Sequence, residues 1–351
     1  IDPSRIEQWL GHCDKAHVGI CDQAVPPRST NVLRTLLLVD IAQGCLVRLP
    51  TSTRYFALSY VWGNLPSTTE TRKENLDFLC SEGTITATTR VLQLPNTIRD
   101  ALRLLQRLGE KYLWVDRLCI VQDDEANRNV HITNMDSIYA NAYCTIVAAD
   151  GEDADYGLPG AGLRPRHLLQ RTLDFPSCSF KSIFPPDATR GWTLQEVELS
   201  RRRIIFYGQT MFWECNTLQW QEEVPAAPEV LQRGFVDRPF RQGASKGRWP
   251  NLEYWGDIVK QYSQRTLTFP SDAQAAFSGI ESALERSFPG GFLYGLPEFF
   301  FDEAVLWLPL AGISRRNREH KSISGYHVPS WSWLGWAGDL SIGLCKYEIY
   351  P

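Results

Sequence analysis

Hydrophobic and polar positions repeat with the helical period in some stretches and with the strand period in others. The order of these stretches divides the chain into three predicted parts. The first part, residues 1–54, opens with an apolar stripe at helical spacing. The stripe consists of Ile6, Trp9, Leu10 and Cys13. Two strand-like runs follow, separated by a turn at Gln43 and Gly44. We therefore expect a helix and a β-hairpin that precede the main body of the protein.

The middle part, residues 55–200, alternates strand and helix signals. The expected elements are, in order, a strand at Phe56–Val61, a helix at Pro95–Leu108, a strand at Tyr112–Asp116, a helix at 131–142 and a strand at Thr145–Ala148. The strands are apolar nearly throughout, as strands covered on both faces are. This alternation favours a mostly parallel sheet flanked by helices, in which the three strands lie side by side.

The third part, residues 201–351, begins with one or two strands. After a linker rich in Pro, Gly and Arg, at residues 225–250, it turns helical. It ends near "PSWSWLGWAG", which we expect to pack into an aromatic core. The predicted fold class is thus α/β, with a mostly parallel central sheet, an N-terminal hairpin prefix and a C-terminal mixed α+β elaboration. The pattern leaves open whether 201–351 is an independent domain.

Composition and charge indicate which classes of partner and which cellular compartment to expect. The net charge of −4 gives no electrostatic reason to expect nucleic acid or an anionic membrane. The apolar runs are too short to span a bilayer. Nine scattered cysteines and the absence of a signal-peptide pattern at the start favour reduced thiols over a disulfide framework. We therefore predict a cytoplasmic protein without nucleic-acid or membrane partners.

Several long sequence words resemble the fungal heterokaryon incompatibility (HET) domain family. They include "YFALSYVWG", "YLWVDRLCIVQDD", "RGWTLQEVELSRRRIIFY" and "PSWSWLGW", in the family's order. The resemblance extends roughly from Trp9 to Trp336. It implies a role in fungal non-self recognition and programmed cell death, or in a paralogue diverted to other work.

The order of strands and helices is also similar to the Toll/interleukin-receptor (TIR) fold, which implies a TIR-like core. In that fold a late helix begins with a Trp-Cys-x-x-Glu pattern. Trp192 and Glu196 match its tryptophan and glutamate, whereas Thr193 replaces the cysteine. In TIR enzymes this glutamate is the catalytic residue of NAD hydrolysis. The resemblance therefore implies that Glu196 is catalytic and that NAD is a substrate, with no separate cofactor.

Breaking the bond between nicotinamide and ribose passes through an oxocarbenium-like state, which a carboxylate at Glu196 would stabilise. Trp62 or Trp192 would stack on a base or on the nicotinamide ring. Arg117, or the run at residues 201–203, would bind the pyrophosphate. The alternative for Glu196 is a surface carboxylate paired loosely with a neighbouring arginine.

Other candidate residues lie where predicted strands end. Asp116 ends one strand, and Ser59, Trp62 and Gly63 end another. Open α/β sheets bind their ligands at the carboxyl ends of the strands, so we predict one cleft that presents these residues together with Glu196. The alternatives are structural: Asp116 would cap the next loop or pair with Arg117, Ser59 would bind a backbone amide, and Gly63 would only form a turn.

The cysteines offer two further candidate sites. Cys119 is a possible nucleophile, but no histidine is near in sequence and a buried, inert thiol is favoured. Cys13, His17 and Cys21 are spaced at i, i+4 and i+8, which on one continuous helix would line one face. No fourth ligand accompanies them at a known spacing, so a buried helix face is favoured and no metal is predicted.

Three functions remain open at this stage. The first is a nucleotide hydrolase of the NAD-nucleosidase kind, with a small nucleotide as its substrate. The second is a non-catalytic signalling module that self-associates or binds other signalling proteins. The third is a metabolic enzyme that reuses the fold on another small molecule, with the acidic loop Glu152–Asp155 shaping the pocket.

Overall fold

The computed structural model describes most of the chain. The described residues are 1–23, 33–162, 164–166, 172–175, 178–181, 196, 199–207, 209–222, 250–265, 267, 273–285, 287–316 and 328–342.

The chain divides into two compact units, which are described separately. Unit 1 comprises Ile1–Ala188 and Ser200–Val236, and unit 2 comprises Thr189–Leu199 and Asp237–Pro351. The three parts predicted from the sequence follow different boundaries, at residues 54 and 200.

Unit 1 is built on an eight-stranded mixed sheet. Its strands are β1 (Thr35–Asp40), β2 (Cys45–Pro50), β3 (Phe56–Ser59), β4 (Tyr112–Trp114), β5 (Cys144–Ala148), β8 (Arg202–Tyr207), β9 (Thr210–Cys215) and β10 (Gln219–Gln221). They lie in the order β10-β9-β8-β5-β3-β4-β1-β2. The four central strands, β8, β5, β3 and β4, run parallel, and antiparallel strands extend the sheet at both edges.

The parallel core confirms the predicted pairing of the three middle strands. Phe56 of β3 lies opposite Leu113 of β4 on one side and Cys144 of β5 on the other. The sheet as a whole is less parallel than predicted, because the β1–β2 hairpin and β9–β10 add antiparallel edges. It also crosses the predicted boundaries, since β1, β2 and β8–β10 belong to the same sheet as β3–β5.

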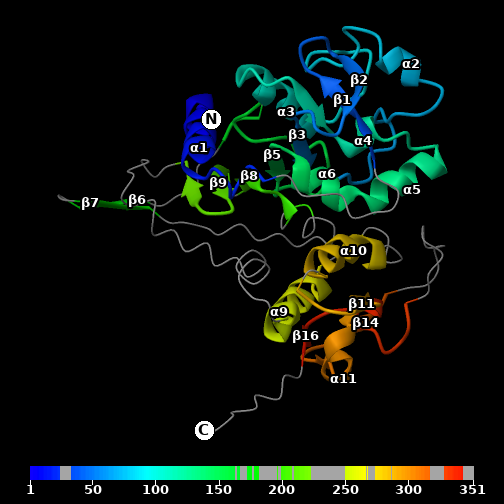
Figure 1. Cartoon of the computed structure of the whole chain (residues 1–351). Coiled ribbons are helices and arrows are strands. Elements are labelled where there is room, and N and C mark those ends of the chain that lie inside the picture. The colour runs from blue at the N-terminus through cyan, green and yellow to red at the C-terminus, as the bar shows by residue number, and fades with distance from the viewer. Residues whose placement is uncertain are drawn as a thin grey trace. The chain divides into compact units, whose positions relative to one another are not determined.

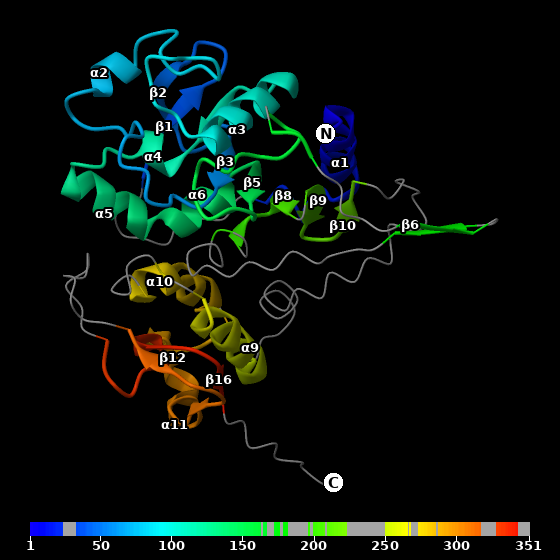
Figure 2. The same cartoon turned by 180° about the vertical axis from the view of Figure 1, so that it is seen from behind.

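Helices surround this sheet in unit 1. They are α1 (Pro3–Ala16), α2 (Leu76–Leu79), α3 (Asn96–Arg107), α4 (Asp116–Cys119), α5 (Glu125–Thr133) and α6 (Met135–Asn141). Both views show α1 beside β9 at one end of the sheet, with the β1–β2 hairpin and α2 at the other end (Figure 1 and Figure 2). A separate hairpin pairs β6 (Thr172–Phe175) with β7 (Cys178–Lys181). Among the described residues no helix has the length and apolar character that crossing a membrane requires.

Three predicted elements differ in the structure. The strand expected at Phe56–Val61 ends at Ser59. The strand expected at Tyr112–Asp116 ends at Trp114, because the Cys119 amide donates to the Val115 carbonyl at 2.7 Å and turns the chain into α4. The helix expected at 131–142 is two helices that meet at Asn134. The side-chain Nδ2 of Asn134 donates to the Val130 carbonyl at 2.8 Å, at the point where α5 ends. Local hydrogen bonds of this kind compete with the regular pattern.

Tryptophan packing holds α1 against the edge of the sheet. Trp9 of α1 is 2% exposed, and its ring centroid lies 6.4 Å from that of Trp213 in β9 and 6.3 Å from that of Trp220 in β10. Large aromatic rings bury much apolar area, so this contact helps to attach the helix to the sheet. The N-terminal helix therefore depends on strands from the far end of unit 1's sequence.

The loop at residues 151–162 is docked onto the start of α3. The Leu158 amide donates to Asp100 Oδ2 at 3.0 Å, and the Gly157 amide donates to Thr97 Oγ1 at 3.0 Å. A side chain at Gly162 would collide with Asp100, because its Cβ would lie 1.6 Å from Oδ1. The buried Asp100 carboxylate thus organises a loop that follows β5 in sequence.

Unit 2 has its own aromatic core. Its elements are α9 (Leu252–Ser263), α10 (Ala273–Leu284), β11 (Phe292–Leu293), β12 (Leu296–Pro297), η3 (Glu298–Phe300), α11 (Phe301–Ala304), β13 (Leu308–Pro309), β14 (Ser314–Arg315), η4 (Trp333–Gly335), β15 (Trp336–Ala337) and β16 (Leu340–Ser341). Trp333 is fully buried and meets Phe277 and Tyr262 edge-on, with centroids 4.8 and 5.7 Å away. Trp333 is therefore packed in an aromatic core, as predicted, whereas Trp331 is 37% exposed and Trp336 is half-buried.

Our first prediction concerns the buried ion pair between neighbouring strands. Arg203 of β8 and Glu214 of β9 are register partners, with Nη2 and Oε2 2.5 Å apart. Glu214→Ala leaves the buried guanidinium without this carboxylate. We expect the free energy of unfolding, measured in urea, to fall by about 3–5 kcal/mol. The double variant Arg203→Met/Glu214→Leu should recover most of the loss, and equal losses in both proteins would contradict this explanation.

The second prediction concerns pH. Burial raises the pKa of Glu281 in α10 to about 7, although Gln274 Nε2 donates to its Oε2 at 3.1 Å. Because the folded pKa exceeds the unfolded one, the stabilising contribution of this group is complete below the unfolded pKa and is lost as pH rises through about 7. Glu281→Gln should raise the melting temperature at pH about 8.5 and give little gain at pH about 5. A gain of the same size at both pH values would contradict it.

Candidate functional site

The carboxyl ends of β3 and β4 bring together three of the residues singled out in the sequence. Trp62 follows β3, whereas Asp116 and Arg117 open α4 directly after β4. Because β3 and β4 are parallel neighbours, the carboxyl ends of the two strands lie at the same edge of the sheet. Ser59 is the last residue of β3 and is 1% exposed, so it lies within the core and not on an open surface.

The three side chains form one rigid group. Trp62 Nε1 donates to Asp116 Oδ2 at 2.6 Å, and the Arg117 amide donates to Asp116 Oδ1 at 2.7 Å. The Arg117 guanidinium lies over the Trp62 ring, 4.1 Å from its centroid. Stacking of a cation on an indole and charge-assisted hydrogen bonds both favour a fixed geometry. Asp116 thus orients Trp62 and Arg117 beside the candidate pocket.

Burial changes the protonation chemistry of this group. Desolvation raises the pKa of the Asp116 carboxyl above its ordinary value, and the hydrogen bond from Trp62 opposes that rise. Tyr60 lies two residues before Trp62 and is 6% exposed. Burial raises the pKa of its hydroxyl well above the ordinary value, and the neighbouring Asp116 adds to the effect. Both groups therefore hold their protons more firmly than in water.

A pocket of about 560 Å³ opens next to this group. It is lined by residues 62–70 together with Arg72, Glu74, Asn75 and Arg117. The lining is mostly polar: Arg72 is paired with Glu70 at 2.6 Å, and Glu74 is exposed. Arg117 is buried at the inner wall, where it donates to Thr68 Oγ1, and its Nε has no hydrogen-bond partner among the described residues. Such a lining suits a polar ligand that carries hydroxyl or anionic groups.

Gly63 is required by its surroundings and not only by a turn. Its φ is +65°, and an added Cβ would lie 2.2 Å from the Cβ of Asp153. Asp153 belongs to the acidic loop at residues 151–162, which is docked on α3. The loop therefore supports the rim of the pocket, in line with the expectation that Glu152–Asp155 helps to shape it.

The structure does not bring every candidate to this pocket. Trp192 lies outside the described residues. Glu196 is 7% exposed and belongs to unit 2, whereas the pocket belongs to unit 1. A shared cleft of Glu196 with Trp62 and Asp116 therefore stays a prediction. Burial also argues against the loose surface pairing considered for Glu196.

The arginines at residues 201–203 and Cys119 contact other protein groups within unit 1. Arg201 donates to the carbonyls of Gln23 and Asn141, Arg202 pairs with Asp14 at 2.8 Å, and Arg203 pairs with Glu214. All three guanidinium groups are thus bound within unit 1, away from the pocket lining. Cys119 is fully buried, and burial raises the pKa of its thiol to about 12, so it is not a nucleophile at neutral pH.

Several pocket residues were not predicted from the sequence. Tyr60, which lies beside Asp116 but outside the pocket lining, was not predicted either. Thr68 and Glu74 lie in a polar loop without any periodic pattern, and only the folded chain shows that they line the pocket.

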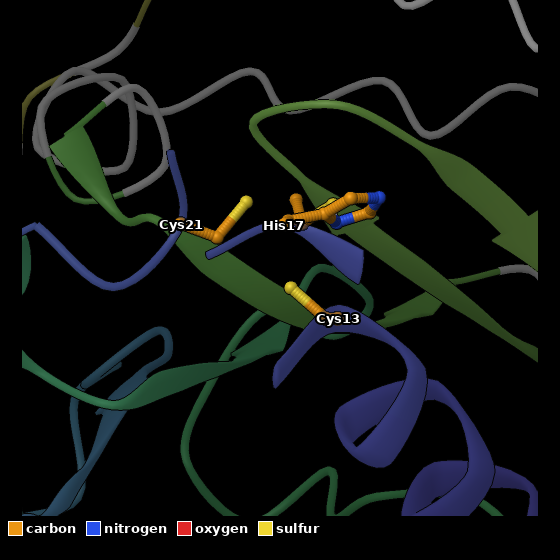
Figure 3. Close-up of side chains that lie close together, drawn as sticks. Cys13, His17 and Cys21 are labelled. Atoms are coloured by element: carbon orange, nitrogen blue, oxygen red, sulfur yellow. The ribbon is translucent and has the colours of Figure 1, made fainter. Parts of the chain in front are cut away.

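One group of side chains in the described part of the chain has the composition of a metal site. It comprises Cys13, His17, Cys21 and Cys215, all buried, with their ligand atoms within 4.8 Å of one another. Figure 3 shows the first three side chains gathered in one place. The three residues would line one face only on a continuous helix, but α1 ends at Ala16 and Cys21 lies in the following turn. Cys215 was not predicted.

Comparison with known proteins gives the family relationship. Residues 55–196 match the family model described as heterokaryon incompatibility protein (HET). The chain is also similar to heterokaryon incompatibility protein 6, OR allele, of Neurospora crassa, with 31% identity over 108 residues. That match covers 29% of this chain and 15% of the Neurospora protein.

These matches support the HET family for the segment that holds the pocket, and they relate the chain to heterokaryon incompatibility proteins. No solved structure matches the chain. The similarity to the TIR fold stays a prediction.

The third prediction tests the support of the pocket rim. Gly63→Ala combines an unfavourable positive φ with a collision against Asp153, whereas Gly83→Ala has the unfavourable φ alone, at +82° with nothing within 4 Å. We expect Gly83→Ala to lower the free energy of unfolding in urea by about 1 kcal/mol. Gly63→Ala should cost about 1–3 kcal/mol more, because the packed loop must move. Equal costs would show that the contact with Asp153 places no constraint on the rim.

Proposed function

We propose that this chain acts in fungal non-self recognition and that its HET segment binds a nucleotide, with NAD as the leading candidate. The observation that carries the proposal is the pocket at the carboxyl ends of β3 and β4, which lies inside the segment that matches the HET family. Open α/β sheets bind nucleotides at this edge. The family match supports the biological role, and the pocket supports the ligand class.

The pocket chemistry supports a nucleotide more than an apolar ligand. Trp62 offers an aromatic surface beside a buried arginine, and guanidinium groups bind phosphate oxygens well. Glu74 and Asn75 offer partners for ribose hydroxyls. The volume of about 560 Å³ is in the usual range for small-molecule sites, which is about 300–1,000 Å³.

Glu196 is the proposed catalytic residue. In the reaction, the bond between ribose C1′ and the nicotinamide nitrogen breaks, and nicotinamide leaves as a neutral molecule with the electron pair of that bond. Water adds to C1′ and loses a proton, which gives ADP-ribose. A carboxylate near C1′ stabilises the positive charge that develops on the ribose. The buried position of Glu196 supports this role, because electrostatic interactions are stronger away from water.

Assembly without catalysis is the second candidate function. Exposed apolar side chains gather along one short stretch of unit 2, at Leu306, Leu308 and Leu310, which are 62%, 58% and 56% exposed. Apolar side chains of this size in water favour association. The two functions are compatible, because clustering of chains would promote cell-death signalling with or without NAD turnover.

The fourth prediction tests the catalytic proposal. The full chain, clustered through a bivalent antibody to an affinity tag, should release nicotinamide from NAD. Glu196→Gln should lower the rate about a thousandfold, because the charge that stabilises the transition state is lost while size and shape are kept. Glu82→Gln, an exposed glutamate outside the pocket lining, serves as the matched control and should keep the rate. Nicotinamide is measured by chromatography.

Two further results separate the proposed functions. A photoreactive NAD analogue should label residues 62–75, and excess NAD should compete for this labelling. Labelling without turnover in a sample shown to be clustered would favour a ligand-binding signalling module. Equal rates for wild type and Glu196→Gln would remove this residue from the mechanism, and labelling only outside the pocket would overturn the proposed site.

A further inference from the structure

The sulfur and imidazole cluster lies at the end of unit 1's sheet, on elements that the pocket does not use. Cys13 is in the last turn of α1, and His17 is the residue that caps this helix. The amides of Ile20 and Cys21 donate to the His17 carbonyl at 3.1 and 3.0 Å, which folds the chain back so that Cys21 faces the cluster. Cys215 ends β9. Helix, turn and strand thus converge on one point.

The spacing of the ligand atoms is close to that of a tetrahedral site. Zinc–sulfur and zinc–nitrogen bonds of about 2.3 and 2.0–2.1 Å place a sulfur and a nitrogen ligand about 3.6 Å apart at tetrahedral angles. His17 Nδ1 lies 3.5 Å from Cys215 Sγ. Two sulfur ligands are expected about 3.8 Å apart. All four ligand atoms lie within 4.8 Å of one another, so only small side-chain movements separate them from this geometry.

Hydrogen-bond donors surround the sulfur atoms. The amides of Thr217 and Leu218 both donate to Cys215 Sγ, at 3.4 and 3.3 Å. Arg202 Nε donates to Cys13 Sγ at 3.2 Å. Donors aimed at sulfur favour the thiolate, which is the form that binds metal. Three thiolates carry one negative charge more than Zn²⁺ neutralises, and the Arg202 guanidinium offsets that charge.

We propose that Cys13, His17, Cys21 and Cys215 form a structural zinc site. Three cysteines and one histidine match the ligand set of closed, four-coordinate zinc sites, in which no position is left for substrate. Burial agrees with a structural role, since the four residues are at most 5% exposed. A merely apolar cluster has no reason to include an imidazole.

The site joins distant parts of the sequence. It fixes the end of α1 and the following turn to the last residue of β9, beside the packing of Trp9 on Trp213. A metal that closes so long a loop removes much conformational freedom from the unfolded chain. Zinc therefore holds the N-terminal helix on the edge of the sheet.

The fifth prediction is that the full chain, purified under reducing conditions without chelator, contains about one zinc per chain, as a single tetrahedral site requires. The metal is measured by inductively coupled plasma mass spectrometry. Replacement by Co²⁺ should give the intense visible absorption and the sulfur-to-cobalt charge-transfer bands of a tetrahedral thiolate site. Removal of zinc with a chelator should lower the melting temperature, and added zinc should restore it.

Variants separate ligands from ordinary buried cysteines. Cys215→Ser should weaken zinc affinity by more than about a hundredfold, the upper end of what changes around the ligands cost. Cys144→Ala, at a fully buried cysteine of β5 outside the cluster, should keep the zinc content and the cobalt spectrum.

The wild-type result decides the proposal even where a variant fails to fold. A reduced, folded wild-type chain that holds no zinc after reconstitution, or that shows only the weak spectrum of octahedral cobalt, would overturn the proposal. So would a disulfide between two of the cluster's cysteines in protein isolated from reducing cytosol, as detected by mass spectrometry. Loss of NAD turnover has no bearing on this test, because the pocket and the cluster share no residue.

Discussion

The parallel pairing of β3 with β4 is the constraint on which the candidate site depends. It places Trp62, which follows β3, beside Asp116 and Arg117, which follow β4. The Asp116 carboxylate can therefore accept hydrogen bonds from both the indole of Trp62 and the amide of Arg117. If β4 ran in the opposite direction, these side chains would lie at opposite ends of the sheet. The polar loop at residues 64–75 then needs only to fold over this fixed group to form a pocket.

The central strands were predictable because burial on both faces requires a run of apolar residues. Helix α3 was predictable because its apolar residues repeat at helical spacing. The same apolar signal misled at Val115–Cys119, where a buried short helix and a buried strand look alike in sequence. The hairpin at residues 35–50 was expected, but its place in the same sheet as the central strands was not. Nothing local in "RRRIIFYGQTMFWEC" says that its first strand pairs in parallel with β5, since that contact is set by the whole sheet.

The site residues likewise divide into those that could be predicted from the sequence and those that could not. Asp116, Trp62 and Gly63 stood out because strand ends are readable from sequence, whereas Thr68 and Glu74 reach the pocket only through the path of a loop. Cys215 shows the limit most clearly. Cys13, His17 and Cys21 have a readable spacing, but their fourth partner lies on a strand at the opposite end of unit 1's sequence, and no spacing rule joins them.

The family match and the cluster of Cys13, His17, Cys21 and Cys215 cover different parts of the molecule. The segment that matches the HET family, 55–196, includes the central strands β3, β4 and β5 and the pocket, but neither α1 nor β9. The cluster therefore belongs to elements that extend the sheet beyond this segment. The pocket and the attachment of α1 therefore depend on separate sets of residues.

The sheet order also determines when the contacts of α1 can form during biosynthesis. As the chain leaves the ribosome, α1 emerges before the central strands, but Trp213 and Trp220, against which Trp9 packs, are made only after them. Throughout that interval the apolar face of α1 has no partner in the nascent protein. Exposed apolar surface of this kind promotes aggregation and recruits chaperones. The nascent chain is therefore vulnerable from the emergence of α1 until β10 has been made.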